Sequence, residues 1–459
     1  MQGLKEKKNK VSTQTILSLL CCSLFAVLMV TVSACDDGGD YNNNEKSYES
    51  SFKYSKDGST GYVSKIMTHT AGTGFPIVIM ADGYTQSEID NGAYHAAVTK
   101  AVTALLSNEP MASLKDYLDI YEVTTASSVS GITTAKRSTA FSTYFTSEDG
   151  VEIEGNTEKI ENYAWLALNK SDIIYNSLIL ILVNSSRYAG ITMMGVDQKV
   201  TDSIPGGLSL AFVPVGCTTS SGKECFTEVL QHEAVGHGIG KLCDEYCSEY
   251  AAPTETEIEK YKNMQKIGCY LNSKFDTETE NDRIVGKYTI RQNGIATSYV
   301  MRGHSFKPGE LGYLFASDAG YAGEDLMWNQ GGALYLTLGS ELYDGSEIRY
   351  RGCYTIEKNF YRPSWGSIMN DVLDSSNGKQ FNALSRYVIY ARVMKVAQGS
   401  PGNIHSEELM RRFMQFDKLY GNSSSASAKG IGQSTTSSGT SETLPRLPEP
   451  RIIPAPSFY

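Results

Sequence analysis

Two histidines, a glutamate and an aspartate lie close together in one short stretch of the chain. They are His232, Glu233, His237 and Asp244, within the sequence QHEAVGHGIGKLCDEY. Neutral imidazoles and a carboxylate suit Zn²⁺, and three such ligands leave a fourth position open for water. A glutamate beside the first histidine could act as general base on a metal-activated water. These residues therefore predict metal-assisted hydrolysis. The alternative is a helix that binds no metal.

The spacing of the two histidines departs from the usual pattern. In the H-E-x-x-H motif the histidines are four apart and share one face of a helix. Here they are five apart, which on a regular α-helix separates them by roughly 140°. A π-bulge would bring them back into line, and Gly236 would tolerate the distortion. The alternative is a straight helix that uses Glu233 and His237 as the ligand pair.

The residues around the motif predict a helix followed by a turn. Ser221 and Glu224 form a capping-box pattern, which predicts that the helix begins at Ser221. Gly240 predicts its end, because glycine commonly follows the last turn of a helix. Three residues after this turn are candidates for the third metal ligand: Cys243, Asp244 and Glu245.

Upstream of the motif, strands alternate with helices. A capping box at Thr85 predicts a helix through about Leu106. Apolar runs predict strands at 75–80, 117–123, 178–183 and 208–215. This alternation favours an α/β fold whose sheet packs against the motif helix.

Two blocks of the sequence carry a family resemblance. The first, His237 to Tyr246, reads H-x-x-G-x-L-x-D-E-Y, and the second, Tyr361 to Asn370, reads YRPSWGSIMN. Both resemble the immunoglobulin A metallopeptidase family, which comprises metzincin-like zinc endopeptidases. Weaker similarity extends the resemblance from about residue 75 to about residue 396.

The resemblance implies a role for individual residues. His232 and His237 match the zinc histidines, Glu233 the catalytic glutamate, and Asp244 the third ligand. Met369 matches the methionine of the Met-turn, which lies beneath the metal. The implied fold is an α/β, metzincin-like zinc peptidase fold. It has a mixed twisted sheet, a zinc-binding active-site helix, a Met-turn and an irregular C-terminal subdomain. The chain departs from the common pattern in the extra residue between its histidines.

The N-terminus predicts export and lipid anchoring. A basic start is followed by an apolar stretch from Ile16 to Val32, and the sequence VSAC ending at Cys35 resembles a bacterial lipobox. We expect residues 1–34 to be a lipoprotein signal peptide and Cys35 to be lipidated, with the protein held at the bacterial outer membrane or cell surface. The alternatives are a plain signal peptide or a single membrane span.

Charge and cysteine content narrow the class of protein further. The net charge is −10, and removal of residues 1–34, with four Lys and one Glu, would lower it to −13. An acidic chain without a basic cluster argues against nucleic acid as a partner. Six cysteines follow Cys35, and an even number in an exported chain favours disulfides.

The chain divides into four predicted parts. They are the signal peptide (1–34), a flexible tether (35–60), a zinc metallopeptidase domain (61–420) and a disordered Ser-, Gly- and Pro-rich tail (421–459). The domain itself divides into an upper subdomain with the zinc helix, 61–249, and a lower subdomain with the Met-turn, 250–420.

Together these patterns predict a zinc-dependent endopeptidase that hydrolyses peptide bonds of extracellular proteins. We expect a protein, peptide or glycoprotein substrate, a monomeric chain and a membrane contact through the lipid anchor. The alternative is a non-catalytic surface lipoprotein, a decayed peptidase that binds host or dietary proteins or glycans.

Overall fold

In the computed structural model the described part of the chain runs from residue 61 to residue 453, with gaps. The described residues are 61–169, 171–196, 204, 206–249, 252–275, 284–292, 295–303, 341–344, 348–362, 367–370, 380–400, 402–420 and 446–453. The predicted signal peptide, Cys35 and the tether lie outside them. Among the described helices, none combines the length and the apolar character that a membrane span requires.

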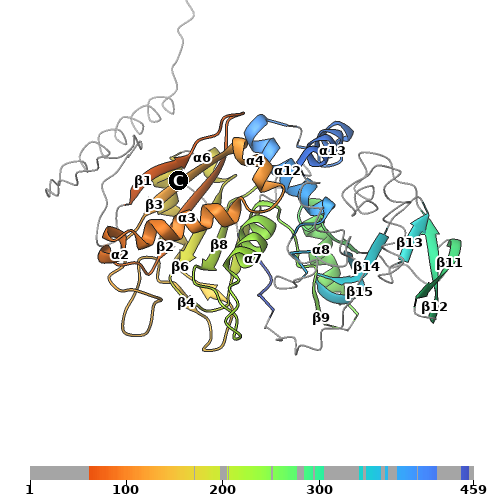
Figure 1. The fold of residues 1–459 in the computed structure, drawn as a ribbon, viewed down its shortest axis with the longest axis horizontal. Helices are drawn as coiled ribbons and strands as arrows, with labels where there is room; N and C mark the ends of the chain where they lie inside the picture. The colour runs from red at the N-terminus through yellow and green to blue at the C-terminus, as the bar shows by residue number, and fades with distance from the viewer. Residues whose placement is uncertain are drawn as a thin grey trace, which may run out of the picture. The chain divides into compact units, whose positions relative to one another are not determined.

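A seven-stranded sheet forms the larger subdomain (Figure 1). Its strands, in spatial order, are β1 (Tyr62–Met67), β3 (Leu118–Thr124), β2 (Phe75–Asp82), β6 (Leu178–Val183), β8 (Ser209–Pro214), β7 (Ile191–Gly195) and β16 (Arg451–Ile453). Strands β3, β2, β6 and β8 are parallel, whereas β1 and β7 run antiparallel to their neighbours β3 and β8. This mixed, mostly parallel sheet confirms the predicted α/β class.

Strand β6 is buried on both faces of this sheet. Its sequence is LILILV, and successive side chains of a strand point to opposite faces. The three leucines join one core with α3 (Ala93–Leu105), α7 (Phe226–Leu230) and α12 (Ala383–Gln398). The isoleucines and Val183 join a second core with α5 (Thr157–Leu168). The helix that carries the histidines lies on the first of these faces.

The four predicted strands are confirmed as β2, β3, β6 and β8. The predicted helix from Thr85 to Leu106 is two helices, α2 (Gln86–Asp90) and α3. The break lies at Gly92, whose φ of +84° is left-handed and cannot continue a right-handed helix. The remaining short elements of this region are α4 (Met111–Leu114), η1 (Lys115–Tyr117), β4 (Tyr144–Phe145), β5 (Ile153–Glu154) and α6 (Ser171–Ile174).

The prediction that the C-terminal subdomain is irregular is wrong for its described parts. These parts form a second sheet, made of β10 (Lys274–Phe275), β15 (Thr355–Arg362), β14 (Ile348–Cys353), β13 (Glu341–Asp344), β12 (Ile295–Gly303), β11 (Ile284–Gln292) and β9 (Cys247–Glu249). Helices α8 (Glu255–Lys266), α12 and α13 (Glu407–Tyr420) also belong to this half of the chain. The Tyr- and Gly-rich composition obscured strands that are rich in β-branched and aromatic residues, such as IVGKYTIRQ.

The prediction of a tail disordered from residue 421 onward is wrong for residues 446–453. Strand β16 pairs in parallel with β7, and its partners run from Met193 to Gly195. Leu447, just before it, is buried and joins the core that contains the histidine helix. The Ser- and Gly-rich composition of the preceding residues concealed this short run, which ends in two isoleucines.

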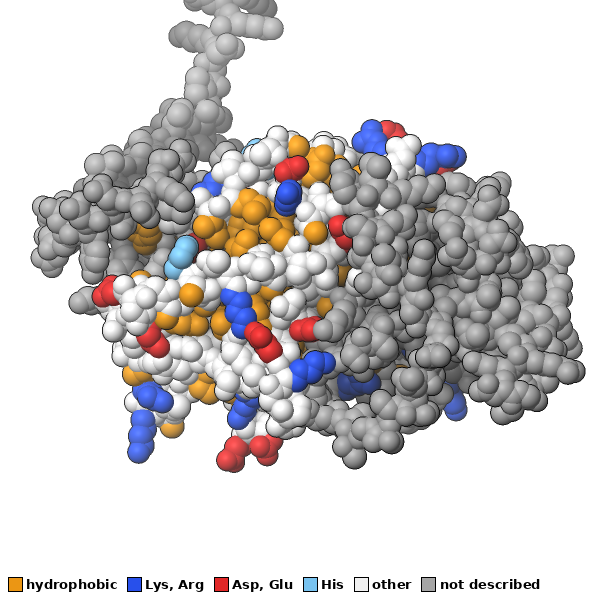
Figure 2. Space-filling model, in the orientation of Figure 1, with side chains coloured by type: hydrophobic (Ala, Val, Ile, Leu, Met, Phe, Trp, Pro, Cys, Tyr) orange, Lys and Arg blue, Asp and Glu red, His pale blue; other side chains and the backbone are white. Residues whose placement is uncertain are grey.

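On the face shown in Figure 2, the described residues form no patch of charges of one sign. On the face shown in Figure 2, Lys and Arg side chains are interspersed with Asp and Glu side chains. This distribution agrees with the lack of a basic cluster in the sequence.

Candidate metal centre

The histidine helix widens where the histidines lie. Helix α7 continues directly into η2 (Gln231–Ile239), a π-helical segment of nine residues. In a π-helix each N–H bonds to the carbonyl five residues earlier, as the Gly240 amide does to the Val235 carbonyl at 2.9 Å. Residues five apart therefore lie on one face. The predicted π distortion is confirmed, and the straight-helix alternative is wrong.

The start of this helix differs from the prediction. It is capped at Cys225 instead of Ser221, and Cys225 forms a disulfide with Cys217. The intervening residues form a tight loop in which Ser221 hydrogen-bonds Thr219. The polar pattern near Ser221 therefore stabilises this loop and does not start the helix.

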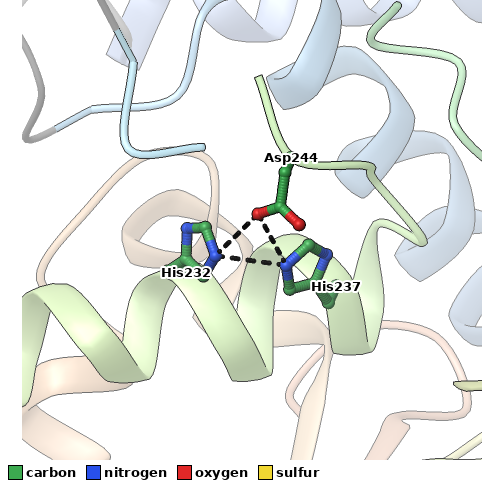
Figure 3. Close-up of side chains that lie close together, drawn as sticks. All are labelled: His232, His237 and Asp244. Atoms are coloured by element: carbon green, nitrogen blue, oxygen red, sulfur yellow. Dashed lines mark hydrogen bonds and ion pairs between the residues drawn. The ribbon is translucent and has the colours of Figure 1, made fainter. Parts of the chain in front are cut away.

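Three potential ligand atoms converge at η2. The Nε2 atoms of His232 and His237 lie 3.1 Å apart, and Oδ1 of Asp244 lies 3.2 Å from the first and 3.4 Å from the second. Figure 3 shows both imidazoles projecting from one helix toward Asp244, which comes from the segment that follows the helix. All three side chains are buried, and their candidate ligand atoms lie within 4.8 Å of one another.

Backbone carbonyls orient both imidazoles. His232 Nδ1 lies 2.9 Å from the Ile368 carbonyl, and His237 Nδ1 lies 2.8 Å from the Leu242 carbonyl. A carbonyl oxygen only accepts, so each Nδ1 must carry the proton. In a neutral imidazole the lone pair then lies on Nε2. Such carbonyl contacts are typical of metal-binding histidines, because they fix both tautomer and ring orientation.

The Asp244 carboxylate lacks hydrogen-bond donors, and a bound cation would compensate its charge. Neither carboxylate oxygen of Asp244 has a hydrogen-bond partner among the described residues, although both are buried. Two lone pairs facing a buried carboxylate suit a divalent cation, and the His–His–Asp donor set suits Zn²⁺.

Glu233 lies beside this group and belongs to the same helix. Burial raises its pKa to about 7, against the opposing effects of His232 and a hydrogen bond from Thr192. The Thr192 hydroxyl contacts both the backbone carbonyl and Oε2 of Glu233, each at 2.8 Å. A Cβ atom at Gly190, just before strand β7, would lie only 2.9 Å from Cγ of Glu233, so this position needs a glycine. The other oxygen, Oε1, has no hydrogen-bond partner in the described structure.

Glu245 holds the ligand loop in place. Its buried carboxylate accepts hydrogen bonds from Asn272, at 3.0 Å, and Asn382, at 2.8 Å, and from the Ser367 hydroxyl, at 2.6 Å. Its backbone amide donates to the Met369 carbonyl at 2.7 Å. One side chain thus joins the loop that carries Asp244 to three distant segments.

Cys243 faces away from the three converging ligand atoms. Its thiol contacts the Ser273 hydroxyl at 3.0 Å and also interacts with the thiol of Cys353. The structure thus places Asp244 in the cluster and leaves Cys243 out of it. The carbonyl of Asp244 accepts from the Tyr354 amide at 2.8 Å, which ties the ligand loop to strand β15.

Met369 packs directly against the π-helical turn. A Cβ atom at Gly236 would lie 2.3 Å from the Met369 sulfur, so only glycine leaves room for this contact. The neighbouring Ile368 supplies the carbonyl that orients His232. Residues 363–366, which belong to the second sequence block, lie outside the described residues.

Residues 68–274 match the model of the IgA Peptidase M64 family. Over these residues the chain is similar to that family. The match includes both histidines, Glu233 and Asp244, and it ends before Met369. This match supports a peptidase, a hydrolase that acts on peptide bonds, and the matched family is one of metallopeptidases. No curated protein matches the chain.

Sequence reasoning missed Thr192, and it named Glu245 only as a candidate ligand, whereas the structure leaves Glu245 out of the ligand group and gives it a network role. Thr192 lies in an apolar strand, and nothing in its sequence neighbourhood indicates that it contacts Glu233. Glu245 stands in the family block, but its partners Asn272, Ser367 and Asn382 are distant in sequence. That Asn272, Ser367 and Asn382 are polar does not indicate that all three hydrogen-bond to Glu245.

Proposed function

We propose that this protein is a zinc-dependent endopeptidase that hydrolyses peptide bonds of extracellular proteins. The observation that supports this most strongly is the convergence of three buried ligand atoms beside the glutamate of the same helix, with the Asp244 carboxylate lacking a hydrogen-bond partner among the described residues. His232, His237 and Asp244 would hold the ion. Bound Zn²⁺ supplies two effects, a lower pKa for a water molecule and polarisation of the scissile carbonyl.

In this proposal Glu233 is the general base. An ideal catalytic base has a pKa near the working pH, and burial raises the pKa of Glu233 to about 7. Glu233 takes a proton from the attacking water and later passes it to the leaving amine. Thr192 holds the carboxylate through Oε2 and leaves Oε1 available for this proton.

We also propose a metzincin-like arrangement with Met369 as its Met-turn. Support comes from the contact of Met369 with Gly236, between the two histidines, and from the Ile368 carbonyl that orients His232. In this role Met369 shapes the floor of the site and binds no metal.

The proposed location rests on the sequence. The basic and apolar N-terminus and the VSAC sequence support a signal peptide, lipidation of Cys35 and attachment to the outer membrane or cell surface. An exported, lipid-anchored peptidase meets proteins, peptides and glycoproteins outside the cell, and these are the proposed substrates.

The experiment that tests the function combines metal content with turnover. The mature protein, made from residue 35 with Cys35→Ser, should contain about one zinc per chain by elemental mass spectrometry. His237→Ala should lose this zinc. Glu233→Gln should keep the zinc and lose cleavage of unfolded casein by roughly 10²–10⁴-fold. Zinc-free wild-type protein, or undiminished cleavage by Glu233→Gln, would contradict the proposal and favour the non-catalytic binding protein.

A further inference from the structure

The C-terminal segment, residues 446–453, lies against the metal centre. The Tyr246 hydroxyl, two residues after Asp244, donates to the Leu447 carbonyl at 2.6 Å. The Arg446 guanidinium lies 5.0 Å from the Tyr246 ring centroid, and its Nη1 donates to the Asn370 carbonyl at 3.1 Å. The segment therefore contacts both polypeptide stretches that frame the site, the one after Asp244 and the one after Met369.

Glu449 joins the segment to strand β15. Its Oε1 accepts from the Thr355 hydroxyl at 2.9 Å. Burial raises the pKa of Glu449, and the charge of Asp244 raises it further whereas His237 lowers it.

The segment then pairs with the strand that contacts the catalytic glutamate. Gly190, just before β7, packs closely against Glu233, and the Thr192 hydroxyl within β7 donates to it. The next residues of β7, Met193 to Gly195, pair with β16 on the side opposite to β8. An open sheet edge binds an extended peptide through its backbone groups, with side chains adding specificity. The edge that would guide a peptide past Glu233 is therefore filled by the chain itself.

The ion pairs that hold residues 446–453 in place are partly exposed, so a competing peptide could replace them. Arg451 pairs with Glu152 and Glu154, but its side chain is 40% exposed and theirs are 28% and 31% exposed. Partly exposed ion pairs contribute little stability, so they resist displacement weakly. Leu447 is the buried anchor, with 3% of its surface exposed.

Two features of the sequence favour binding of residues 446–453 to the edge of β7 although their ion pairs are weak. Pro448 and Pro450 fix φ and favour an extended conformation, which reduces the entropy lost on docking. The segment is also covalently joined to the domain through residues 421–445. Docking of the segment is therefore intramolecular, which favours it over a separate peptide of the same sequence.

We propose that the outer edge of β7 is the peptide-binding surface of this enzyme, and that residues 446–453 occupy it as a self-bound competitor of the substrate. This proposal rests on the proposed peptidase function. A substrate must displace the segment before it reaches Glu233, so the chain as synthesised is restrained. Loss or displacement of the segment activates it.

The test compares four zinc-loaded mature proteins: the full chain, a chain that ends at residue 445, Arg451→Glu, and Arg451→Glu combined with Glu152→Arg and Glu154→Arg. The probe is a fluorescent peptide with the sequence RLPEPRII, residues 446–453. We expect it to bind the shortened chain saturably in fluorescence anisotropy and the full chain at least tenfold more weakly. Arg451→Glu keeps the whole chain and is the informative variant if shortening harms folding.

Casein cleavage provides the second measurement. We expect the shortened chain and Arg451→Glu to cleave roughly tenfold faster than the full chain, because a larger fraction of molecules has an open site. The charge-reversed combination should restore the slow rate. Arg411→Glu, which breaks a comparable exposed pair with Glu407 on α13, is the matched control and should leave the rate unchanged.

The possible outcomes separate this inference from the proposed function. Equal peptide binding by full and shortened chains, or none by either, together with equal casein rates, would show that residues 446–453 are only a structural strand. Selective peptide binding by the shortened chain without casein cleavage by any variant would retain the binding surface and overturn the peptidase. Peptide binding to Arg451→Glu no stronger than to the full chain would overturn the role of the Arg451 pairs.

Discussion

Asp82 and Asp244 are equally buried carboxylates with opposite surroundings. Asp82 ends strand β2 and has no exposed surface, whereas Asp244 follows the π-helical segment and is 1% exposed. The Asp82 oxygens accept hydrogen bonds from the hydroxyls of Ser127, Thr139 and Thr143 and from the amides of Phe141 and Thr143. The Asp244 oxygens accept none in the described structure.

The difference distinguishes a structural carboxylate from one arranged for a ligand. A buried charge must be compensated, by hydrogen-bond donors or by a cation. The charge of Asp82 is compensated by hydrogen-bond donors of the loop around it, so Asp82 needs no ligand. Asp244 faces two imidazole lone pairs, so its compensation must come from outside the chain. The number of donors thus separates the two roles where burial does not.

The strongest test of this comparison is Asp244→Asn. We expect zinc affinity to fall by at least about 100-fold, because a charged ligand is lost, and casein cleavage to fall with it. The metal-free variant should be as stable as the metal-free wild type or more stable, because an uncompensated buried charge is removed. Zinc competition with a chromophoric chelator and thermal unfolding measure the two effects. A clearly less stable metal-free variant would contradict the comparison.

Asp82→Asn should show the reverse pattern. The new amide would place N–H groups toward hydroxyls and an amide that now donate to the carboxylate, so we expect a loss of about 2–4 kcal/mol in the free energy of unfolding. Zinc content should stay at about one per chain. Denaturant unfolding and elemental analysis provide the measurements. Zinc loss with unchanged stability would mean that Asp82, too, serves the site.

The pH dependence tests Glu233, the second carboxylate of the site, whose Oε1 lacks a donor in the described structure. Glu233 acts as a base only when ionised, and its pKa is raised to about 7. Below that value kcat/KM should fall about tenfold per pH unit. In the metal-free protein, the raised pKa means that Glu233 stabilises the fold at low pH. This contribution is lost as the pH rises through about 7. A flat rate profile between pH 5 and pH 8, measured by initial rates, would argue against Glu233 as the base.

Thr192→Val should have the smallest effect. It removes the hydrogen bond to Oε2 of Glu233, so we expect kcat to fall about tenfold and the acidic limb of the pH profile to shift upward, because that bond lowers the pKa. Thr103→Val in α3 is the matched control, since the Thr103 hydroxyl donates to the Thr99 carbonyl in its own helix. Equal effects of the two substitutions would assign Thr192 a purely structural role.

The sequence was most informative where short-range chemistry decides structure. The apolar runs of β2 and β6 predict buried strands because no other element accommodates them in so few residues. The extra residue before His237, together with Gly236, predicts the widened helix because only that distortion aligns both histidines. Thr192, Asn272 and Asn382 gave no signal, because their roles depend on tertiary contacts with residues far away in the chain. Strand β16 was missed for the same reason, since its partner β7 lies more than 250 residues upstream.

The widened turn at η2 also affects how such sites are detected. A search pattern that demands histidines four apart would pass over this chain, although its imidazoles meet as closely as a metal requires. One inserted residue shifts the spacing from four to five, and the π-helical hydrogen bonds absorb it without moving either ring out of line. A pattern that accepts H-E-x-x-G-H, with an aspartate seven positions after the second histidine, would find other chains whose histidines are aligned by a π-helical turn.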